Sequence, residues 1–272
     1  MKYKILCSDL DGTLLSTKSD VSEVTISEIK RIKDAVKIYL VSARMPKSMT
    51  YLQKDLGIEN QPIVCYNGAL ILHGNTILDS VTIPLRLLKE LYSHTEKHAI
   101  KLGLYYADEW YVEETSERVQ KEIKYTKATP EFRPTPATFQ DWRSRKVDGA
   151  HKVMLMGTKD SCDAIFPELE SRYGDAIATY RSNDTLIEIA PKSVTKLSAI
   201  KTLLKADEDL ADVIAFGDNY NDMDMLQYVG CGVAVGNARN EVKNISNYIA
   251  EENTAHGVAK FIKEHLCDSL YL

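Results

Sequence analysis

Short runs of apolar residues alternate with amphipathic segments in the outer parts of the chain. Five runs of six or seven residues are almost continuously apolar and rich in β-branched side chains, which is typical of buried parallel strands. These runs are residues 3–8, 36–42, 62–68, 212–218 and 231–237. Amphipathic segments such as 22–35 and 46–56 lie between them. The alternation predicts a doubly wound α/β fold with a Rossmann-like parallel sheet.

The middle of the chain has a different pattern. Residues 101–108 and 109–114 predict a β-hairpin, and the proline-rich segment 126–139 predicts a surface loop. Further strands are expected at 151–157, 176–182 and 184–191, with helices at 84–98 and 160–173. We therefore expect an α+β domain at 82–190, inserted into a core formed by residues 1–81 and 191–272.

Composition excludes several kinds of partner. The 272-residue chain has a net charge of −5, which argues against a nucleic-acid backbone or an anionic membrane surface as the main partner. No apolar run is long enough to span a bilayer, and the N-terminus shows no signal-peptide pattern. None of the five cysteines forms a CxxC pair, and four lie in segments typical of the core. These features predict a cytoplasmic protein; its oligomeric state cannot be inferred from them.

The five outer strands end in small or polar residues. The strand ends are Asp9, Ser42, Asn67-Gly68, Gly217-Asp218 and Gly236-Asn237. One such strand end by itself is explained by the residues that ordinary turns prefer. Ligands bind at the carboxyl ends of parallel strands, however, so five such ends together indicate one binding site.

Carboxylates are concentrated in two of these places. In "CSDLDGTLL", Asp9 and Asp11 lie two residues apart, and their repulsion requires a cation or a shared proton. In "FGDNYNDMDML", Asp218 ends a strand as Asp9 does, whereas Asp224 is explained by the favourable dipole at a helix N-terminus.

These segments carry a resemblance to a known family. "DLDGTLL", "LVSAR", the lysine of "APKSVTKLSAI" and "GDNYNDMDML" are similar, in order and spacing, to the four motifs of the haloacid dehalogenase-like (HAD) phosphohydrolases. "YNGA" and the tail "GVAVGNARNEVKNISNYIAEENTAHGVAKFI" resemble the Cof-type branch, which carries an α/β cap between the second and third motifs. The resemblance covers essentially the whole chain outside the inserted domain.

The resemblance implies a Mg²⁺-dependent phosphatase that works through an aspartyl-phosphate. Asp9 would be the nucleophile, and Asp11 the general acid and then the general base. The carboxylates of Asp9 and Asp218 and the backbone carbonyl of Asp11 would hold Mg²⁺, which offsets the carboxylate repulsion. Asp222 would orient a metal-bound water.

The same resemblance implies a phosphate site. Its residues would be Asp9, Gly12, Thr13, Ser42, Ala43, Lys196 and Asn221. Lys196 would neutralise charge on the phosphate and on the nucleophile. Without the family spacing, Ser42 would be interpreted as a helix cap and Lys196 as a solvated surface residue.

The chain departs from the family pattern in three places. Ser42-Ala43 replaces Thr-Gly but keeps the hydroxyl and the N–H, both glycines around Lys196 are absent, and His256 replaces a common aspartate. The implied substrates are small phosphorylated metabolites: sugar phosphates, pyridoxal phosphate or flavin-precursor phosphates. A phosphomutase is the alternative enzyme, and a non-catalytic metabolite-binding protein is a further alternative.

Two groups in the inserted domain have competing interpretations. His94 and His98 lie four apart on a predicted helix and could bind a metal, but the charged segment "SHTEKH" favours a solvated surface. The aromatic residues Tyr105, Tyr106, Trp110 and Tyr111 could stack on a substrate ring, but packing within the hairpin is the simpler explanation.

Overall fold

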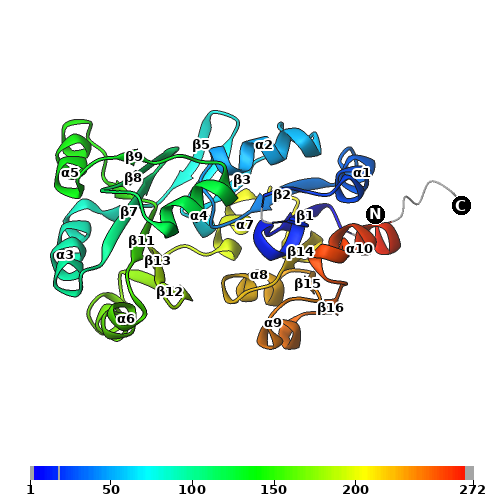
Figure 1. The fold of residues 1–272 in the computed structure, drawn as a ribbon. Helices are drawn as coiled ribbons and strands as arrows, with labels where there is room; N and C mark the ends of the chain where they lie inside the picture. The colour runs from blue at the N-terminus through cyan, green and yellow to red at the C-terminus, as the bar shows by residue number, and fades with distance from the viewer. Residues whose placement is uncertain (1–2, 18, 267–272) are drawn as a thin grey trace, which may run out of the picture. The chain divides into compact units, whose positions relative to one another are not determined.

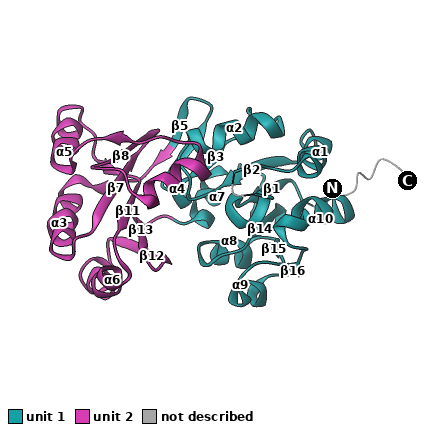
Figure 2. Cartoon of the chain, viewed as in Figure 1, with its two compact units in different colours: residues 1–78, 195–272 teal, residues 79–194 magenta. Residues whose placement is uncertain are grey.

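The computed structural model describes residues 3–17 and 19–266 and divides them into two compact units. Unit 1 comprises residues 1–78 and 195–272, and unit 2 comprises residues 79–194 (Figure 2). The division lies close to the expected boundaries after residues 81 and 190. Each unit has its own sheet.

Unit 1 is built on an eight-stranded sheet whose strand order is β16-β15-β14-β1-β2-β3-β4-β5 (Figure 1). Its strands are β1 Ile5–Ser8, β2 Lys37–Val41, β3 Ile63–Cys65, β4 Leu70–His73, β5 Thr76–Ser80, β14 Val213–Gly217, β15 Cys231–Ala234 and β16 Tyr248–Ile249. The pairs from β16 through to β3 are parallel, and β3 pairs with β4 in the antiparallel direction. The predicted parallel sheet is confirmed, with an antiparallel edge that the sequence pattern did not predict.

The helices of unit 1 form two packed groups. They are α1 Glu23–Ile32, α2 Lys47–Leu56, α7 Lys196–Leu203, α8 Met223–Tyr228, α9 Asn240–Ile245 and α10 Gly257–His265. Helix α1 packs against α2 and α10, and α8 packs against α7 and α9. Local signals explain their ends: Ser22 caps the N-terminus of α1, and Gly57 ends α2 in the left-handed conformation at φ 67°.

Unit 2 is an α+β domain with a six-stranded sheet in the order β12-β13-β11-β7-β8-β9. The strands of this sheet are β7 Lys101–Tyr106, β8 Glu109–Val112, β9 Glu131–Phe132, β11 Lys152–Met156, β12 Ile177–Asn183 and β13 Leu186–Pro191. Two further strands, β6 Ile83–Pro84 and β10 Gly149–Ala150, pair with each other in a separate two-stranded sheet. Its helices are α3 Leu85–Thr95, α4 Glu117–Thr126, α5 Thr135–Ser144 and α6 Lys159–Tyr173. The hairpin predicted from the sequence is confirmed as β7 and β8.

The proline-rich segment 126–139 corrects one expectation. It is not only a surface loop, because it contains β9 and the first residues of α5. Pro136 lies in the first turn of α5, where a missing backbone N–H removes no helical hydrogen bond. The prolines Pro134 and Pro136 therefore lie at the start of a helix, a position that tolerates proline.

The cores account for most of the cysteines. Cys7, Cys65, Cys162 and Cys231 are buried free thiols, as predicted for core residues, and Cys267 lies outside the described residues. Among the residues that the structure describes, no helix has the length and apolar character needed to cross a membrane.

Candidate active site

The nucleophile candidate lies at the centre of the unit 1 sheet. Strand β1 pairs with both β2 and β14, so the residues that follow these three strands meet at one edge. Asp9 follows β1 directly, is 5% exposed, and donates its backbone N–H to the carbonyl of Phe216 in β14 at 3.0 Å. Adjacent central strands therefore bring Asp9 and Asp218 together, although they are 209 positions apart in the sequence.

A tight turn follows Asp9. Gly12 has φ +82°, and a Cβ at this position would lie 2.5 Å from Oδ2 of Asp218. Only glycine combines this left-handed conformation with the close approach of a carboxylate. Thr13 Oγ1 donates a hydrogen bond to Oδ1 of Asp218 at 3.4 Å. The turn thus places Asp218 against the segment that carries Asp9 and Asp11.

Lys196 lies in the middle of this cluster. Its Nζ is 2.5 Å from Oδ1 of Asp9 and 2.6 Å from Oδ1 of Asp222, and its side chain has no exposed surface. Thr195 caps the N-terminus of α7 by accepting a hydrogen bond from the N–H of Ser198, which positions the lysine without either of the family's glycines. The alternative of a solvated Lys196 is wrong.

Asp222 links this lysine to the turn after β14. Its Oδ2 accepts hydrogen bonds from the N–H groups of Asp218 and Asn219, at 2.9 and 3.0 Å, while its Oδ1 contacts Lys196. Asp222 is completely buried. The carboxylate therefore holds both the lysine and the backbone that carries Asp218.

The electrostatics of the cluster show an excess of negative charge. Burial raises the pKa of Asp9 well above its usual range, and Asp222 and Asp218 raise it further against the opposing effect of Lys196. Burial and Asp222 also raise the pKa of Asp218, to about 7. Burial alone would lower the pKa of Lys196, but Asp222 and Asp9 outweigh it and raise that pKa.

This donor set fits a divalent cation. Asp9, Asp218 and Asp222 each offer a carboxylate oxygen, and these oxygens lie within 4.8 Å of one another. When all three carboxylates are ionised, one ammonium group leaves two negative charges uncompensated, and a divalent cation would balance them. Hard cations such as Mg²⁺ prefer all-oxygen donors of this kind. Asp11 is not part of this carboxylate set, and its expected contribution through the backbone carbonyl stays a prediction.

The strand ends after β2 and β3 bring further predicted residues into contact. Ser42 is buried, and its carbonyl accepts a hydrogen bond from the N–H of Asn67 at 2.9 Å. Asn67 has φ 56° and accepts a hydrogen bond at 3.0 Å from the side chain of Asn221. Ala43, next to Ser42, is half-buried. The side chain of Asn221, expected to contact phosphate, is therefore positioned by Asn67.

Arg44 is the main residue of the site that the sequence reasoning did not single out. Its Nε and Nη2 contact the two carboxylate oxygens of Asp11 at 2.8 and 2.7 Å, although Arg44 is 4% exposed and Asp11 is exposed. Burial would lower the pKa of Arg44, but the hydrogen bond and charge of Asp11, together with Tyr51, outweigh burial and raise that pKa. The sequence offered one signal for Arg44: it lies two residues after Ser42, at the predicted end of a strand that leads into the site. A buried arginine there requires an acidic partner.

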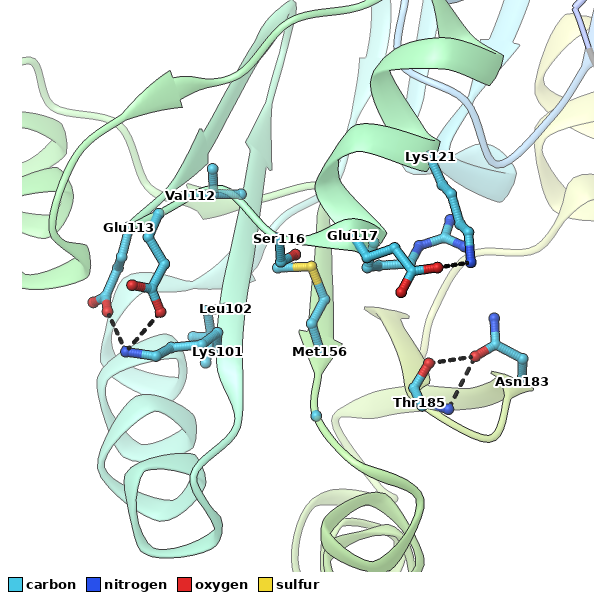
Figure 3. Close-up of a pocket in the computed structure, with 13 residues that line it drawn as sticks. Lys101, Leu102, Val112, Glu113, Ser116, Glu117, Lys121, Met156, Asn183 and Thr185 are labelled. Atoms are coloured by element: carbon cyan, nitrogen blue, oxygen red, sulfur yellow. Dashed lines mark hydrogen bonds and ion pairs between the residues drawn. The ribbon is translucent and has the colours of Figure 1, made fainter.

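Both units contain hollows of several hundred Å³, and the residues that line them differ. In unit 1, a hollow of 520 Å³ opens beside the turn that follows Asp9; it is lined by Asp11, Gly12, Ser16, Thr17, Asn253 and Thr254. In unit 2, a hollow of 390 Å³ has Lys101, Glu113 and Glu114 in its lining. Lys101 contacts Glu113, as Figure 3 shows. Its Nζ also lies 3.6 Å from Oε1 of Glu114. Because its lysines already contact carboxylates, that second hollow is a weaker candidate for binding an anion.

Two predictions for unit 2 have opposite outcomes. Tyr105 and Trp110 stack at 5.4 Å with an interplanar angle of 7°, and both are buried, which confirms packing as their role. The prediction of a solvated surface for His94 is wrong, because this residue is 9% exposed and contacts Glu168 of α6. Helix packing overrode the charged local sequence.

Comparisons with known proteins found similar sequences and a similar fold. A family model described as haloacid dehalogenase-like hydrolase matches residues 6–262. A phosphatase-like protein of Haemophilus influenzae is 32% identical, over 97% of this chain and 98% of that one. The 5-amino-6-(5-phospho-D-ribitylamino)uracil phosphatase YitU of Bacillus subtilis is 29% identical, over 97% and 98%. A crystal structure of a haloacid dehalogenase-like hydrolase from Bacteroides thetaiotaomicron superposes with a TM-score of 0.87, at 27% identity, covering 97% of this chain and 99% of that one.

Proposed function

We propose that this chain, which belongs to the haloacid dehalogenase-like hydrolases and to their Cof-type phosphatase branch, hydrolyses small phosphorylated metabolites with the help of Mg²⁺. The family and its relatives confirm the predicted class of enzyme, a phosphoric monoester hydrolase. One observation carries the proposed mechanism: Lys196 is buried between Asp9 and Asp222, with Asp218 beside them.

In the first step, a carboxylate oxygen of Asp9 attacks phosphorus and the bond to the substrate's alkoxide breaks. Asp11 gives a proton to the departing alkoxide, and Ser42 and Ala43 hydrogen-bond the transferring phosphoryl group. Lys196 balances charge on the nucleophile and on the phosphoryl oxygens. A Mg²⁺ held by Asp9, Asp218 and the Asp11 carbonyl would supply further positive charge next to the phosphate.

In the second step, water attacks the aspartyl-phosphate and Asp11 takes its proton, which releases inorganic phosphate and restores Asp9. The carboxylate of Asp11 accepts two hydrogen bonds from Arg44, which fix its orientation next to the turn that follows Asp9. Asp11 must leave Arg44 to donate a proton in the first step.

The substrate proposal covers sugar phosphates, pyridoxal phosphate and flavin-precursor phosphates. The name of the Bacillus subtilis relative supports the inclusion of a flavin precursor among the substrates to be tested. We also propose a cytoplasmic site of action, for which the four buried free thiols are the support.

The test measures phosphate release from these three classes of substrate, with Mg²⁺ and with EDTA. We expect release by the wild type only with Mg²⁺, and a loss of about 10³-fold or more for Asp9→Asn. Asp224→Asn is the matched control, because Asp224 lies in the same acidic segment as Asp218 and Asp222 but is exposed. Activity that persists in EDTA or in Asp9→Asn would contradict the mechanism, and an isomerised sugar phosphate would indicate the phosphomutase.

A further inference from the structure

A second group of possible metal ligands lies in unit 2. His94 in α3, His98 in the turn Glu96–His98 that follows it, and Glu168 in α6 place one ligand atom each within 4.8 Å of one another. Nε2 of His94 is 2.8 Å from Oε2 of Glu168, and Nε2 of His98 is 3.7 Å from the same oxygen. Two imidazoles from one helical segment therefore converge on a single carboxylate oxygen from another.

The state of His94 points to a ligand rather than to an ordinary ion pair. Its Nε2 is buried and makes no hydrogen bond within the described part of the chain, although the carboxylate oxygen is only 2.8 Å away. The contact is close but lacks the direction that a hydrogen bond requires. A buried polar atom left in this state is unfavourable by about 1–3 kcal/mol. A cation that accepts the nitrogen lone pair would remove this cost.

A cation can reach this group from solvent. The side chain of Glu168 is 48% exposed and that of His98 is 20% exposed. A hollow of about 370 Å³ lies beside them, lined by His94, Pro167, Glu168, Ser171 and Arg172. Arg172 is the positive charge of this lining, and its guanidinium lies over the ring of Tyr173 at 6.0 Å. The carboxylate of Glu168 and the imidazole of His98 are therefore reached from solvent, while the buried ring of His94 forms the inner side of the group.

We propose that His94, His98 and Glu168 form a binding site for a borderline transition-metal ion of the Zn²⁺ class. Two histidines and one carboxylate are a ligand set used for Zn²⁺, with a fourth position left for water. Histidines four residues apart on one helical face are a common source of two such ligands. The bound ion would connect the end of α3 to α6 and so stabilise unit 2. The proposal is independent of the phosphatase mechanism.

The ligand chemistry separates this site from the one in unit 1. The cluster around Asp9 offers only carboxylate oxygens, which suit Mg²⁺, whereas imidazole nitrogen favours Zn²⁺, Co²⁺ or Ni²⁺ over Mg²⁺. Excess Mg²⁺ can therefore occupy the first site while leaving the second open. Both tryptophans of the chain, Trp110 and Trp142, lie in unit 2, so their fluorescence reports on the unit that contains the new site.

The experiment titrates Zn²⁺ into the full-length protein in excess Mg²⁺, by calorimetry and by thermal unfolding followed through tryptophan fluorescence. We expect one equivalent to bind and to raise the unfolding temperature. His98→Gln and Glu168→Gln should each weaken binding by at least about tenfold and remove the thermal shift. Both changes are at solvent-accessible side chains, so the apo proteins should fold as the wild type does.

His73→Gln is the matched control, because His73 is an exposed histidine of unit 1. Co²⁺ gives a second readout, since a low-coordinate nitrogen site absorbs visible light far more strongly than an octahedral oxygen site. The proposal is supported if binding and absorption are kept in His73→Gln and lost in His98→Gln and Glu168→Gln. It is overturned if Zn²⁺ does not bind in excess Mg²⁺, or if either ligand variant binds it as tightly as the wild type.

Discussion

Each unit buries a lysine against a carboxylate, but the surroundings of the two lysines differ in net charge. In unit 1, Nζ of Lys196 contacts the carboxylates of Asp9 and Asp222, and the carboxylate of Asp218 lies beside these two. In unit 2, Lys152 lies 3.2 Å from one carboxylate, that of Glu188, and its Nζ lies 4.6 Å from the centre of the Tyr105 ring. The first group needs another cation, whereas the second is already neutral.

This difference explains why similar pairs have different uses. Burial alone would raise the pKa of Glu188, but Lys152 and the hydroxyl of Ser182 outweigh it and lower that pKa. The pKa of Asp9, by contrast, stays raised even with a lysine at 2.5 Å. The lysine and glutamate of unit 2 compensate each other's charge, so this pair needs no further ion. The cluster of unit 1 has more carboxylates than cations, which favours the binding of a cation.

The largest effect is expected for Lys196→Met. Removing the ammonium group of Lys196 leaves the carboxylates of Asp9 and Asp222 without the cation that they contact, so the free energy of unfolding should fall by about 3–5 kcal/mol without metal. Mg²⁺ should restore part of this loss but not the phosphatase activity. Urea unfolding followed by far-UV circular dichroism, with and without Mg²⁺, measures both effects. Wild-type stability of the metal-free variant would show that the charge excess does not exist.

Lys152→Met should have a smaller effect that does not depend on Mg²⁺. It leaves Glu188 without its cation, but the Glu188 side chain is 25% exposed and reaches water, so we expect a loss of about 2 kcal/mol. The double variant Lys152→Met/Glu188→Leu should recover most of it, because no unpaired charge remains. Tryptophan fluorescence measures the unfolding. A double variant less stable than the single one would refute the idea of a self-balanced pair.

A third prediction concerns a buried histidine of unit 2. His151 is 1% exposed, its Nδ1 accepts a hydrogen bond from the N–H of Ala107 at 3.0 Å, and burial lowers its pKa to about 4. Between pH 6.5 and pH 4 the unfolded chain takes up a proton that the folded chain refuses. This contribution to stability is therefore complete above pH 6.5 and is lost as the pH falls through that window.

Between pH 7.5 and pH 5 this histidine should lower the free energy of unfolding by about 2 kcal/mol. His151→Gln should remove that contribution from the pH dependence of stability. Urea unfolding of both proteins at the two pH values gives the comparison. Because other titrating groups are common to both, the difference between the two profiles isolates the histidine. Parallel profiles for the wild type and the variant would mean that His151 titrates normally.

The smallest effect is expected for an exposed pair in the same unit. Arg86 and Glu90 of α3 are 3.1 Å apart, with 90% and 45% of their side chains exposed. Solvent screens such a pair, so Arg86→Ala should leave the urea midpoint unchanged within error. A clear destabilisation would show that pairing itself, rather than burial, distinguishes the two lysines.

Much of this organisation followed from local pattern. Continuous apolar runs identified the central parallel strands, because strands buried on both faces have no polar face. The order of the motifs identified the family, and Asp9 and Asp218 stood out because each ends a strand with a carboxylate. The helices of unit 2 were also predicted, apart from α4 and α5, where a proline at the start of α5 was interpreted as a sign of a loop.

Tertiary structure decided which partner each charged side chain has. Nothing local to Arg44 specifies Asp11, which lies 33 residues earlier, or assigns Asp222 to Lys196. The burial of His94 likewise depends on α6, which packs against a segment whose own sequence is charged. Strand and helix periodicity is a short-range property that a sequence displays directly, whereas charge compensation depends on distances between segments that only the folded sheet brings together.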